Sequence, residues 1–141
     1  CGGPEARKDL AASFAKAAED KRIVLIYPEG HLTKVGEHKR IRSGVWHMQE
    51  ASQWPVVPVA TSLGLRWQQE DYAKYPGPAV IEFLDPIPPG LGKDEFLEQL
   101  GGAIRSNTDR LIAEGREWDA ANGIVRAPEK IEPDAKPDTV S

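Results

Sequence analysis

The 141 residues include a single cysteine, so the sequence cannot build an intramolecular disulfide framework or a multi-cysteine zinc site. No apolar run approaches the roughly 20 residues that a membrane-spanning helix needs, and no secretory signal pattern is present. The sequence is 40% hydrophobic and 28% charged, which is typical of globular proteins rather than disordered or fibrous ones. Length and composition therefore predict one domain of ordinary size.

The common catalytic and nucleotide-binding motifs are also absent. There is no G-x-x-x-x-G-K-[ST] phosphate loop, no G-x-G-x-x-G fingerprint after a strand and no G-x-S-x-G nucleophile elbow. His31, His38 and His47 lack the H-E-x-x-H spacing, and no thiolates lie nearby, so we expect no metal site. Cys1 is a conceivable N-terminal nucleophile, but a natural N-terminus that lies further upstream explains it more simply.

Charge is distributed unevenly along the chain. The net charge of −4 combines +3 over residues 1–67 with −7 over residues 68–141. A nucleic-acid-binding protein usually concentrates a larger basic excess on one face, so we expect no nucleic-acid partner. The first half could attract a phosphate or an acidic lipid head group, the alternative being an ordinary solvated surface.

Hydrophobic patterning predicts helices alternating with strands, and hence an α/β fold with helices packed on a mixed, mostly buried sheet. The apolar run 23–27 favours a strand covered on both faces, Pro58 favours an edge or a bulge, and Asp94 is placed as a helix N-cap. We expect residues 1–123 to form the domain and the Pro- and charge-rich residues 124–141 to be a disordered, dispensable tail. The predicted helices are 4–22, 43–52 and 94–114, and the predicted strands are 23–27, 56–61 and 79–84.

A strand-loop-helix-strand segment contains the most specific pattern. Tyr27-Pro28-Glu29-Gly30 ends the first strand, Arg42-Ser43-Gly44 begins the next helix, and Pro55–Ala60 forms the following strand. A glycine just past a buried strand leaves backbone N–H groups that can face an anion, and nearby basic side chains can pair with phosphate oxygens. Pro-Glu-Gly alone is an ordinary turn, whereas the three motifs in this order are much more specific.

In this order the motifs resemble the glycerophospholipid acyltransferase family, whose best-known members are 1-acyl-sn-glycerol-3-phosphate acyltransferases. The resemblance covers roughly residues 20–115 and includes the later stretches 75–77 and 82–91. It implies acyl transfer from acyl-CoA or an acyl carrier protein to lysophosphatidic acid, which forms phosphatidic acid without a cofactor. It also implies work at the cytoplasmic face of a membrane, through segments outside this chain, which is itself expected to be soluble.

Two departures from the family pattern limit what the resemblance implies. Members take their general base from a histidine followed five positions later by aspartate, and no histidine in this chain has that spacing. We therefore expect the chain to be the C-terminal part of an acyltransferase, inactive alone, with the catalytic dyad upstream of Cys1. In addition, His31-Leu32 replaces the family's threonine-arginine, which removes the expected phosphate-binding guanidinium.

The predicted substrate-binding residues follow from this comparison. Arg42 is the first candidate to replace the missing guanidinium, because it keeps the family's basic-x-glycine position before a helix. Glu29 either contacts the acceptor or bonds loop backbone N–H groups. Trp67 and Tyr72 could touch the membrane interface. A non-catalytic α/β module that binds lipid or anion is the alternative function; a nucleotide-binding domain is weakened by the absent phosphate loops. The full predicted set is Glu29, Gly30, His31, Lys39, Arg40 and Arg42.

Overall fold

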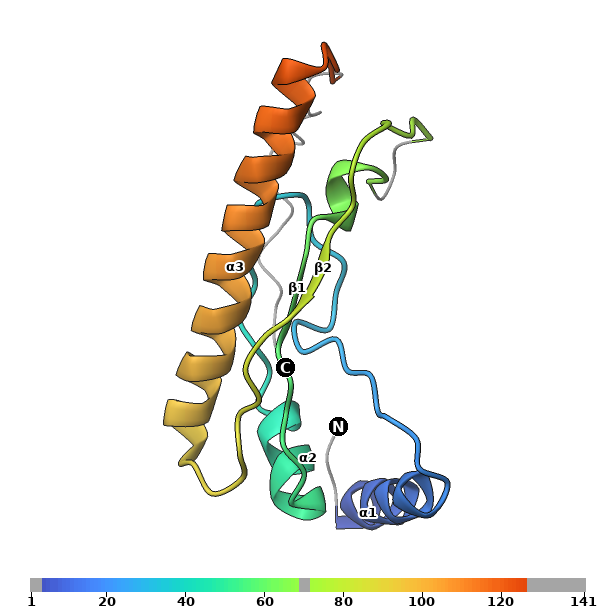
Figure 1. Cartoon of the computed structure of the whole chain (residues 1–141). Helices are drawn as coiled ribbons and strands as arrows, with labels where there is room; N and C mark the ends of the chain where they lie inside the picture. The colour runs from blue at the N-terminus through green and yellow to red at the C-terminus, as the bar shows by residue number, and fades with distance from the viewer. Residues whose placement is uncertain (1–3, 69–71, 127–141) are drawn as a thin grey trace, which may run out of the picture.

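The structure is a computed structural model that describes residues 4–68 and 72–126. One long helix, α3, runs along a two-stranded sheet, α2 packs near the N-terminal end of α3, and α1 lies across the base (Figure 1). The elements in chain order are α1 (Pro4–Glu19), α2 (Gly44–Ser52), β1 (Val59–Thr61), a 3-10 turn (Leu63–Leu65), β2 (Ile81–Phe83) and α3 (Lys93–Ala121).

Helix α3 confirms the longest predicted helix and extends it by seven residues at its C-terminal end. Phe96, Leu100, Leu111 and Ile112 are buried along one stripe, as their helical spacing predicts. The N-cap prediction was wrong, because Gly92 occupies that position and its carbonyl accepts a hydrogen bond from Phe96 N–H at 2.8 Å. Asp94 lies instead in the first turn, where the helix dipole favours a negative charge.

The hydrophobic core forms where α2, α3 and the segment before α3 meet, around Ile41, Val45, Ile87, Phe96 and Leu100. Helix α2 confirms its prediction within one residue, with Val45 buried. Its second buried residue is Gln49. The Gln49 side-chain amide donates to the Ile87 carbonyl at 2.9 Å, so burial leaves this donor satisfied.

The sheet consists of β1 and β2 paired antiparallel, with Ala60 opposite Glu82. Ala60 is fully buried on the side of α3, whereas Phe83 is 74% exposed. Pro58 interrupts the ladder, as expected for a proline, and pairing resumes at a bridge between Val56 and Ile87. Within residues 4–68 and 72–126 the sheet is therefore neither mixed nor mostly buried, although helices packed on strands remain compatible with an α/β fold.

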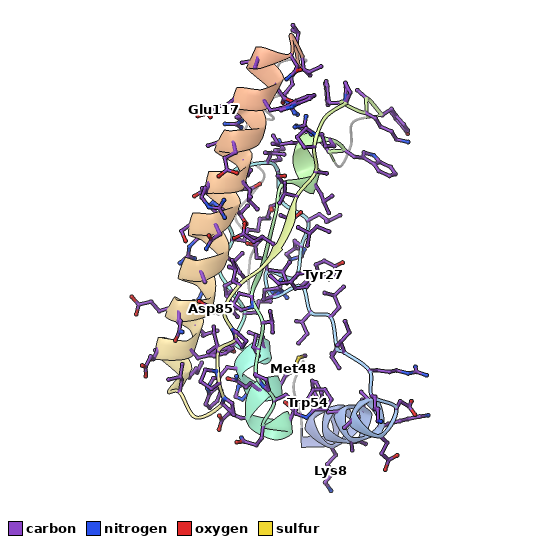
Figure 2. All side chains as sticks on the ribbon, in the orientation of Figure 1. Lys8, Tyr27, Met48, Trp54, Asp85 and Glu117 are labelled. Atoms are coloured by element: carbon purple, nitrogen blue, oxygen red, sulfur yellow. The ribbon has the colours of Figure 1, made fainter. Side chains whose placement is uncertain are left out.

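The predicted buried strand at residues 23–27 was wrong. The segment has no regular structure, and Ile23 and Leu25 are 93% and 70% exposed. Figure 2 shows Tyr27 on the outer side of this segment, away from α3. A strand requires a neighbour to pair its backbone groups, and no described residue forms a backbone hydrogen bond with residues 23–26. Only Ile26 packs against the core.

Helix α1 and the residues just after α3 contact the rest of the molecule through specific side-chain and backbone groups. Phe14 of α1 meets Trp54 edge-to-face, with 5.7 Å between the ring centroids. Beyond α3, Ile124 N–H donates to the Asp119 carbonyl at 2.9 Å, so the first residues of the predicted tail still contact the helix. Residues 127–141 and Cys1 lie outside the described residues. No helix in the described ranges has the length and apolar character needed to cross a membrane.

Candidate functional site

Residues 28–42 form a long loop whose two ends lie next to each other, and we call this segment the basic loop. Arg42 N–H donates to the Pro28 carbonyl at 2.9 Å and closes its base. At its start, Gly30 N–H donates to the Tyr27 carbonyl at 3.0 Å, and a second turn joins Glu37 N–H to the Lys34 carbonyl at 3.0 Å. The two predicted motifs at residues 27–30 and 42–44 are therefore adjacent in space.

Gly30 and Arg42 are in close contact at the base of the basic loop. Gly30 has a φ of +73°, which non-glycine residues rarely adopt. A Cβ at this position would lie 2.8 Å from Arg42 Nε and 2.9 Å from its Cζ. The backbone conformation thus favours glycine here, and the missing side chain leaves the space that the Arg42 guanidinium occupies.

His31 completes the contact, because its Nε2 lies 2.7 Å from Arg42 Nη2. A guanidinium can only donate hydrogen bonds, so His31 Nε2 must be the unprotonated acceptor. The structure thus brings together three of the predicted site residues, Gly30, His31 and Arg42.

The electrostatic setting of Arg42 suits an anion. Its one side-chain hydrogen bond to a described residue goes to a neutral imidazole, so no carboxylate cancels its charge. It also precedes the N-terminus of α2, where Ser43 forms no side-chain capping bond. The N–H groups and dipole at a helix N-terminus favour negative charge. A phosphate or carboxylate at this position would meet both a guanidinium and the end of a helix.

The other predicted residues lie on the same loop but are not joined to Arg42. Lys39 Nζ lies 4.0 Å from Glu37 Oε1, and Arg40 is exposed without a hydrogen bond or ion pair to a described residue. Glu29 is half-buried, and its carboxylate forms no hydrogen bond with the described residues. The expected alternative, in which Glu29 bonds loop backbone N–H groups, is therefore not observed in this part of the chain.

An unpredicted pair, His38 and Asp109, fastens the basic loop to α3. His38 Nε2 lies 2.7 Å from Asp109 Oδ1, with 23% of the histidine side chain and 57% of the aspartate side chain exposed. The two residues are 71 positions apart, and a search for histidine and aspartate at short spacing could not find them. Ile41, further along the loop, is buried against Gly101 of the same helix.

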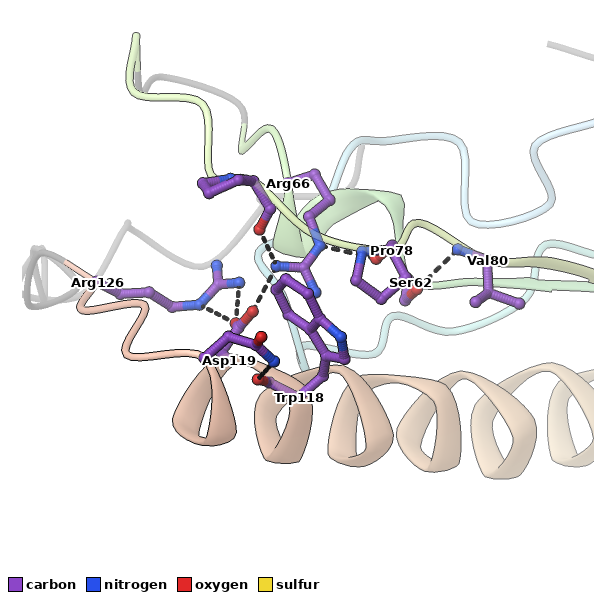
Figure 3. A network of polar contacts seen from close by, with 9 residues as sticks. Ser62, Arg66, Pro78, Val80, Trp118, Asp119 and Arg126 are labelled. Atoms are coloured by element: carbon purple, nitrogen blue, oxygen red, sulfur yellow. Dashed lines mark hydrogen bonds and ion pairs between the residues drawn. The ribbon is translucent and has the colours of Figure 1, made fainter.

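A second unpredicted cluster contains Arg66, Asp119 and Arg126 (Figure 3). Arg66 Nη1 donates to Asp119 Oδ1 at 2.5 Å, and Arg126 Nε donates to Asp119 Oδ2 at 2.9 Å. Arg66 also donates to the carbonyls of Pro76 and Pro78, so its guanidinium joins the segment before β2 to α3. Burial by itself raises the pKa of Asp119, but hydrogen bonds and attraction from the two arginines outweigh burial and leave the pKa below its ordinary value.

The aromatic residues predicted for a membrane interface lie on the segment that follows β1. Trp67 and Tyr72 are both strongly exposed. The Lys74 ammonium lies 4.5 Å from the centroid of the Trp67 ring, close enough for a cation–π contact. Trp46, in contrast, is partly buried and donates from Nε1 to the Leu91 carbonyl at 3.1 Å.

Comparison with known proteins shows which family the first part of the chain is similar to. The family model described as Acyltransferase matches residues 3–62, a range that contains the whole basic loop, α2 and β1. A 1-acyl-sn-glycerol-3-phosphate acyltransferase of Pseudomonas aeruginosa is 33% identical over 72 residues. A protein of the same name from Cocos nucifera is 28% identical over 86 residues. Over these residues the chain is similar to the acyltransferase family.

The chain spans 28% of the length of each of these two relatives. The aligned residues are 51% of this chain for the Pseudomonas aeruginosa protein and 60% for the Cocos nucifera protein. No solved structure matches the chain significantly. The comparison therefore confirms the family resemblance on the part of the sequence that holds the contact between Gly30, His31 and Arg42.

Proposed function

We propose that this chain supplies the acceptor-binding part of a 1-acyl-sn-glycerol-3-phosphate acyltransferase. The observation that carries the proposal is the Arg42 guanidinium, which lies over Gly30 with no carboxylate partner among the described residues. Both relatives are named for acyl transfer to 1-acyl-sn-glycerol 3-phosphate, an acceptor with a phosphate group. A guanidinium beside a helix N-terminus is chemically suited to hold that phosphate.

The reaction joins an acyl group to the free hydroxyl of lysophosphatidic acid. The hydroxyl oxygen attacks the thioester carbonyl of acyl-CoA or an acyl carrier protein, a new ester bond forms, and the thiol leaves as the hydroxyl loses its proton. The product is phosphatidic acid. In this proposal Arg42 holds the phosphate, Gly30 lets it approach the backbone, and Glu29, His31, Lys39 and Arg40 border the site.

The proton acceptor for this step is assigned to residues outside the 141. A histidine acts as a general base when a carboxylate fixes its tautomer and stabilises the imidazolium. The family's histidine-x4-aspartate spacing does not occur in the sequence, and His38 and Asp109 fasten the basic loop to α3. The chain alone is thus expected to bind the acceptor's phosphate without transferring an acyl group.

The exposed apolar residues fit the same proposal. The run 23–27 has the composition of a buried strand yet is largely exposed. In a longer protein it pairs within a wider, mixed and buried sheet.

Because both the acceptor and the product are lipids, the enzyme works at a membrane surface, on the cytoplasmic side.

Steady-state kinetics with a longer form of the protein test the proposal, with lysophosphatidic acid as acceptor and acyl-CoA or acyl carrier protein as donor. Arg42→Ala is expected to raise the acceptor KM by about 10- to 150-fold, the loss of a charged hydrogen bond. Arg116→Ala, which removes an exposed arginine of α3, is the matched control and leaves KM unchanged. An unchanged KM in Arg42→Ala contradicts the role of Arg42.

The non-catalytic alternative makes a different prediction in the same assay. A lipid- or anion-binding module binds lysophosphatidic acid with the same dependence on Arg42 but releases no thiol from acyl-CoA or acyl carrier protein. Thiol release measured together with acceptor binding therefore separates the two functions.

A further inference from the structure

His31 and Arg42 stand out among the described side-chain pairs because the partner of the arginine carries no negative charge. The distance between His31 Nε2 and Arg42 Nη2 is 2.7 Å, and both side chains lie at the surface. Elsewhere the paired arginines have at least one carboxylate partner: Arg110 pairs with Glu82 and Glu114 as well as with the Asn107 amide oxygen, and Arg66 pairs with Asp119.

The chemical identity of its partner determines how strongly an arginine can still attract an anionic ligand. A carboxylate orients a guanidinium and also cancels its charge, which weakens its attraction for a further anion. A neutral imidazole nitrogen accepts one N–H of the guanidinium and leaves the full charge in place. The Nε and Nη1 groups of Arg42 form no hydrogen bond to a described residue, so they remain available to a ligand.

Orientation matters here because Arg42 has little other support. The guanidinium lies against Gly30, whose missing side chain provides the space. Among the described residues, the hydrogen bond to His31 is its one directional side-chain contact. A long exposed side chain loses conformational entropy when it binds a ligand, and a partner that restricts it beforehand reduces that loss.

We propose that His31 is a positioning residue that holds the Arg42 guanidinium over Gly30 without neutralising it, so that the pair recognises a phosphate monoester. This inference rests on the proposed function and deepens it, because it names the residue that orders the phosphate-binding arginine. It assigns His31 no proton transfer and no contact with the reacting thioester.

Phosphate binding by the full 141-residue chain tests the proposal. The probes are inorganic phosphate and sn-glycerol 3-phosphate, and the Kd is followed from the Arg Nε–H and His ring signals in NMR titrations. His31→Ala is expected to weaken binding about 2- to 10-fold, the loss of one hydrogen bond that orders the guanidinium. His31→Gln, whose amide oxygen can accept the same N–H, is expected to restore binding to within about twofold.

A third variant separates orientation from charge. His31→Glu keeps an acceptor beside Arg42 but adds the negative charge that the proposal says is absent, so it is expected to weaken binding more than His31→Ala does. Arg116→Ala is the control for removing an exposed arginine and leaves Kd unchanged. The proposal is overturned if His31→Ala binds as well as the parent, if His31→Gln shows no recovery, or if His31→Glu binds more tightly. A parent chain that binds neither probe overturns it as well.

Kinetics of the longer protein separate this inference from the proposed function. If His31→Ala raises the acceptor KM with little change in kcat, and His31→Gln recovers it, both stand. If the phosphate titrations follow the expected order but lysophosphatidic acid is not acylated, the inference holds and the proposed function fails. If acylation proceeds with an unchanged KM in His31→Ala, the proposed function holds and the inference fails.

Discussion

Arg66 and Arg42 are each held by another side chain, but in opposite environments. Arg66 is buried and shares the carboxylate of Asp119 with Arg126. Arg42 is exposed and hydrogen-bonded to a neutral histidine. A buried charge must be paired because its desolvation is costly, whereas an exposed charge can stay uncompensated in water. The comparison teaches that the buried arginine serves to join two parts of the fold, and that the exposed one remains available to a ligand.

The largest expected effect comes from breaking the buried cluster. Asp119→Ala leaves two arginines without their shared carboxylate, and it is expected to lower the free energy of unfolding by about 3–5 kcal/mol. Urea denaturation measures this. At a temperature where the variant is folded, its phosphate Kd should equal that of the parent, because Arg42 belongs to the other region. An unfolding free energy within experimental error of the parent would contradict the structural role of Asp119.

Acid should weaken the buried cluster in a definite direction. The folded-state pKa of Asp119 is lowered from its ordinary value of 3.8, so its contribution to stability is fully present above that value. The contribution is lost as the pH falls below 3.8 and through the lowered folded-state pKa. The free energy of unfolding, measured from pH 6 downward, should fall in this window. It should fall less steeply in Asp119→Asn, with Asp85→Asn, an exposed aspartate, as the matched control.

Gly30→Ala tests whether the backbone conformation at residue 30 helps to position the exposed arginine, Arg42. The positive φ alone costs an alanine roughly 1–2 kcal/mol, and the added methyl group displaces the Arg42 guanidinium, which lies within 3 Å of its position. We expect a moderate loss of stability together with weaker phosphate binding. Gly36→Ala is the control, since Gly36 also has a positive φ but has open space around it. Equal phosphate affinity in the two variants would show that the contact between Gly30 and Arg42 does not shape the site.

A smaller effect is expected at the contact between His38 and Asp109. Because both side chains are partly exposed, a double-mutant cycle of His38→Ala and Asp109→Ala should give a coupling energy of about 0.2–1 kcal/mol. The phosphate Kd should change less than it does in His31→Ala, since this pair fastens the far part of the basic loop. A coupling energy of zero would mean that Ile41 and its core neighbours hold the loop to α3.

The smallest expected effect is that of shortening the C-terminal end. Removing residues 127–141 should leave the Tm unchanged, because their prolines and charges provide no core. Removing residues 124–141 also removes Arg126 and its hydrogen bonds to Asp119, and should lower the Tm. Equal Tm values for the two truncations would show that Arg126 adds nothing to the cluster.

The helices were the most predictable part of the fold, because an amphipathic stripe such as Phe96, Leu100 and Leu111 records which face is buried. The two observed strands were also predicted. Both are shorter than predicted, because only residues 59–61 and 81–83 pair with each other in a continuous ladder. The run 23–27 was predicted wrongly because apolar composition reports a tendency to be buried, while burial itself requires a neighbour. For the site, the order of the motifs predicted the region, and Gly30 and Arg42 do meet there.

Local properties were determined by the sequence alone: the helical stripes, the turn that requires Gly30, the excess of positive charge in the first half, and the motifs that indicate an acyltransferase. Tertiary structure alone decided which charges meet. His38 reaches Asp109 across 71 positions and Arg66 reaches Asp119 across 53, and no local pattern encodes such distances. The physical reason is that an ion pair depends on how helices and loops pack around a shared core, so the same arginine can stabilise the fold or remain available to a ligand.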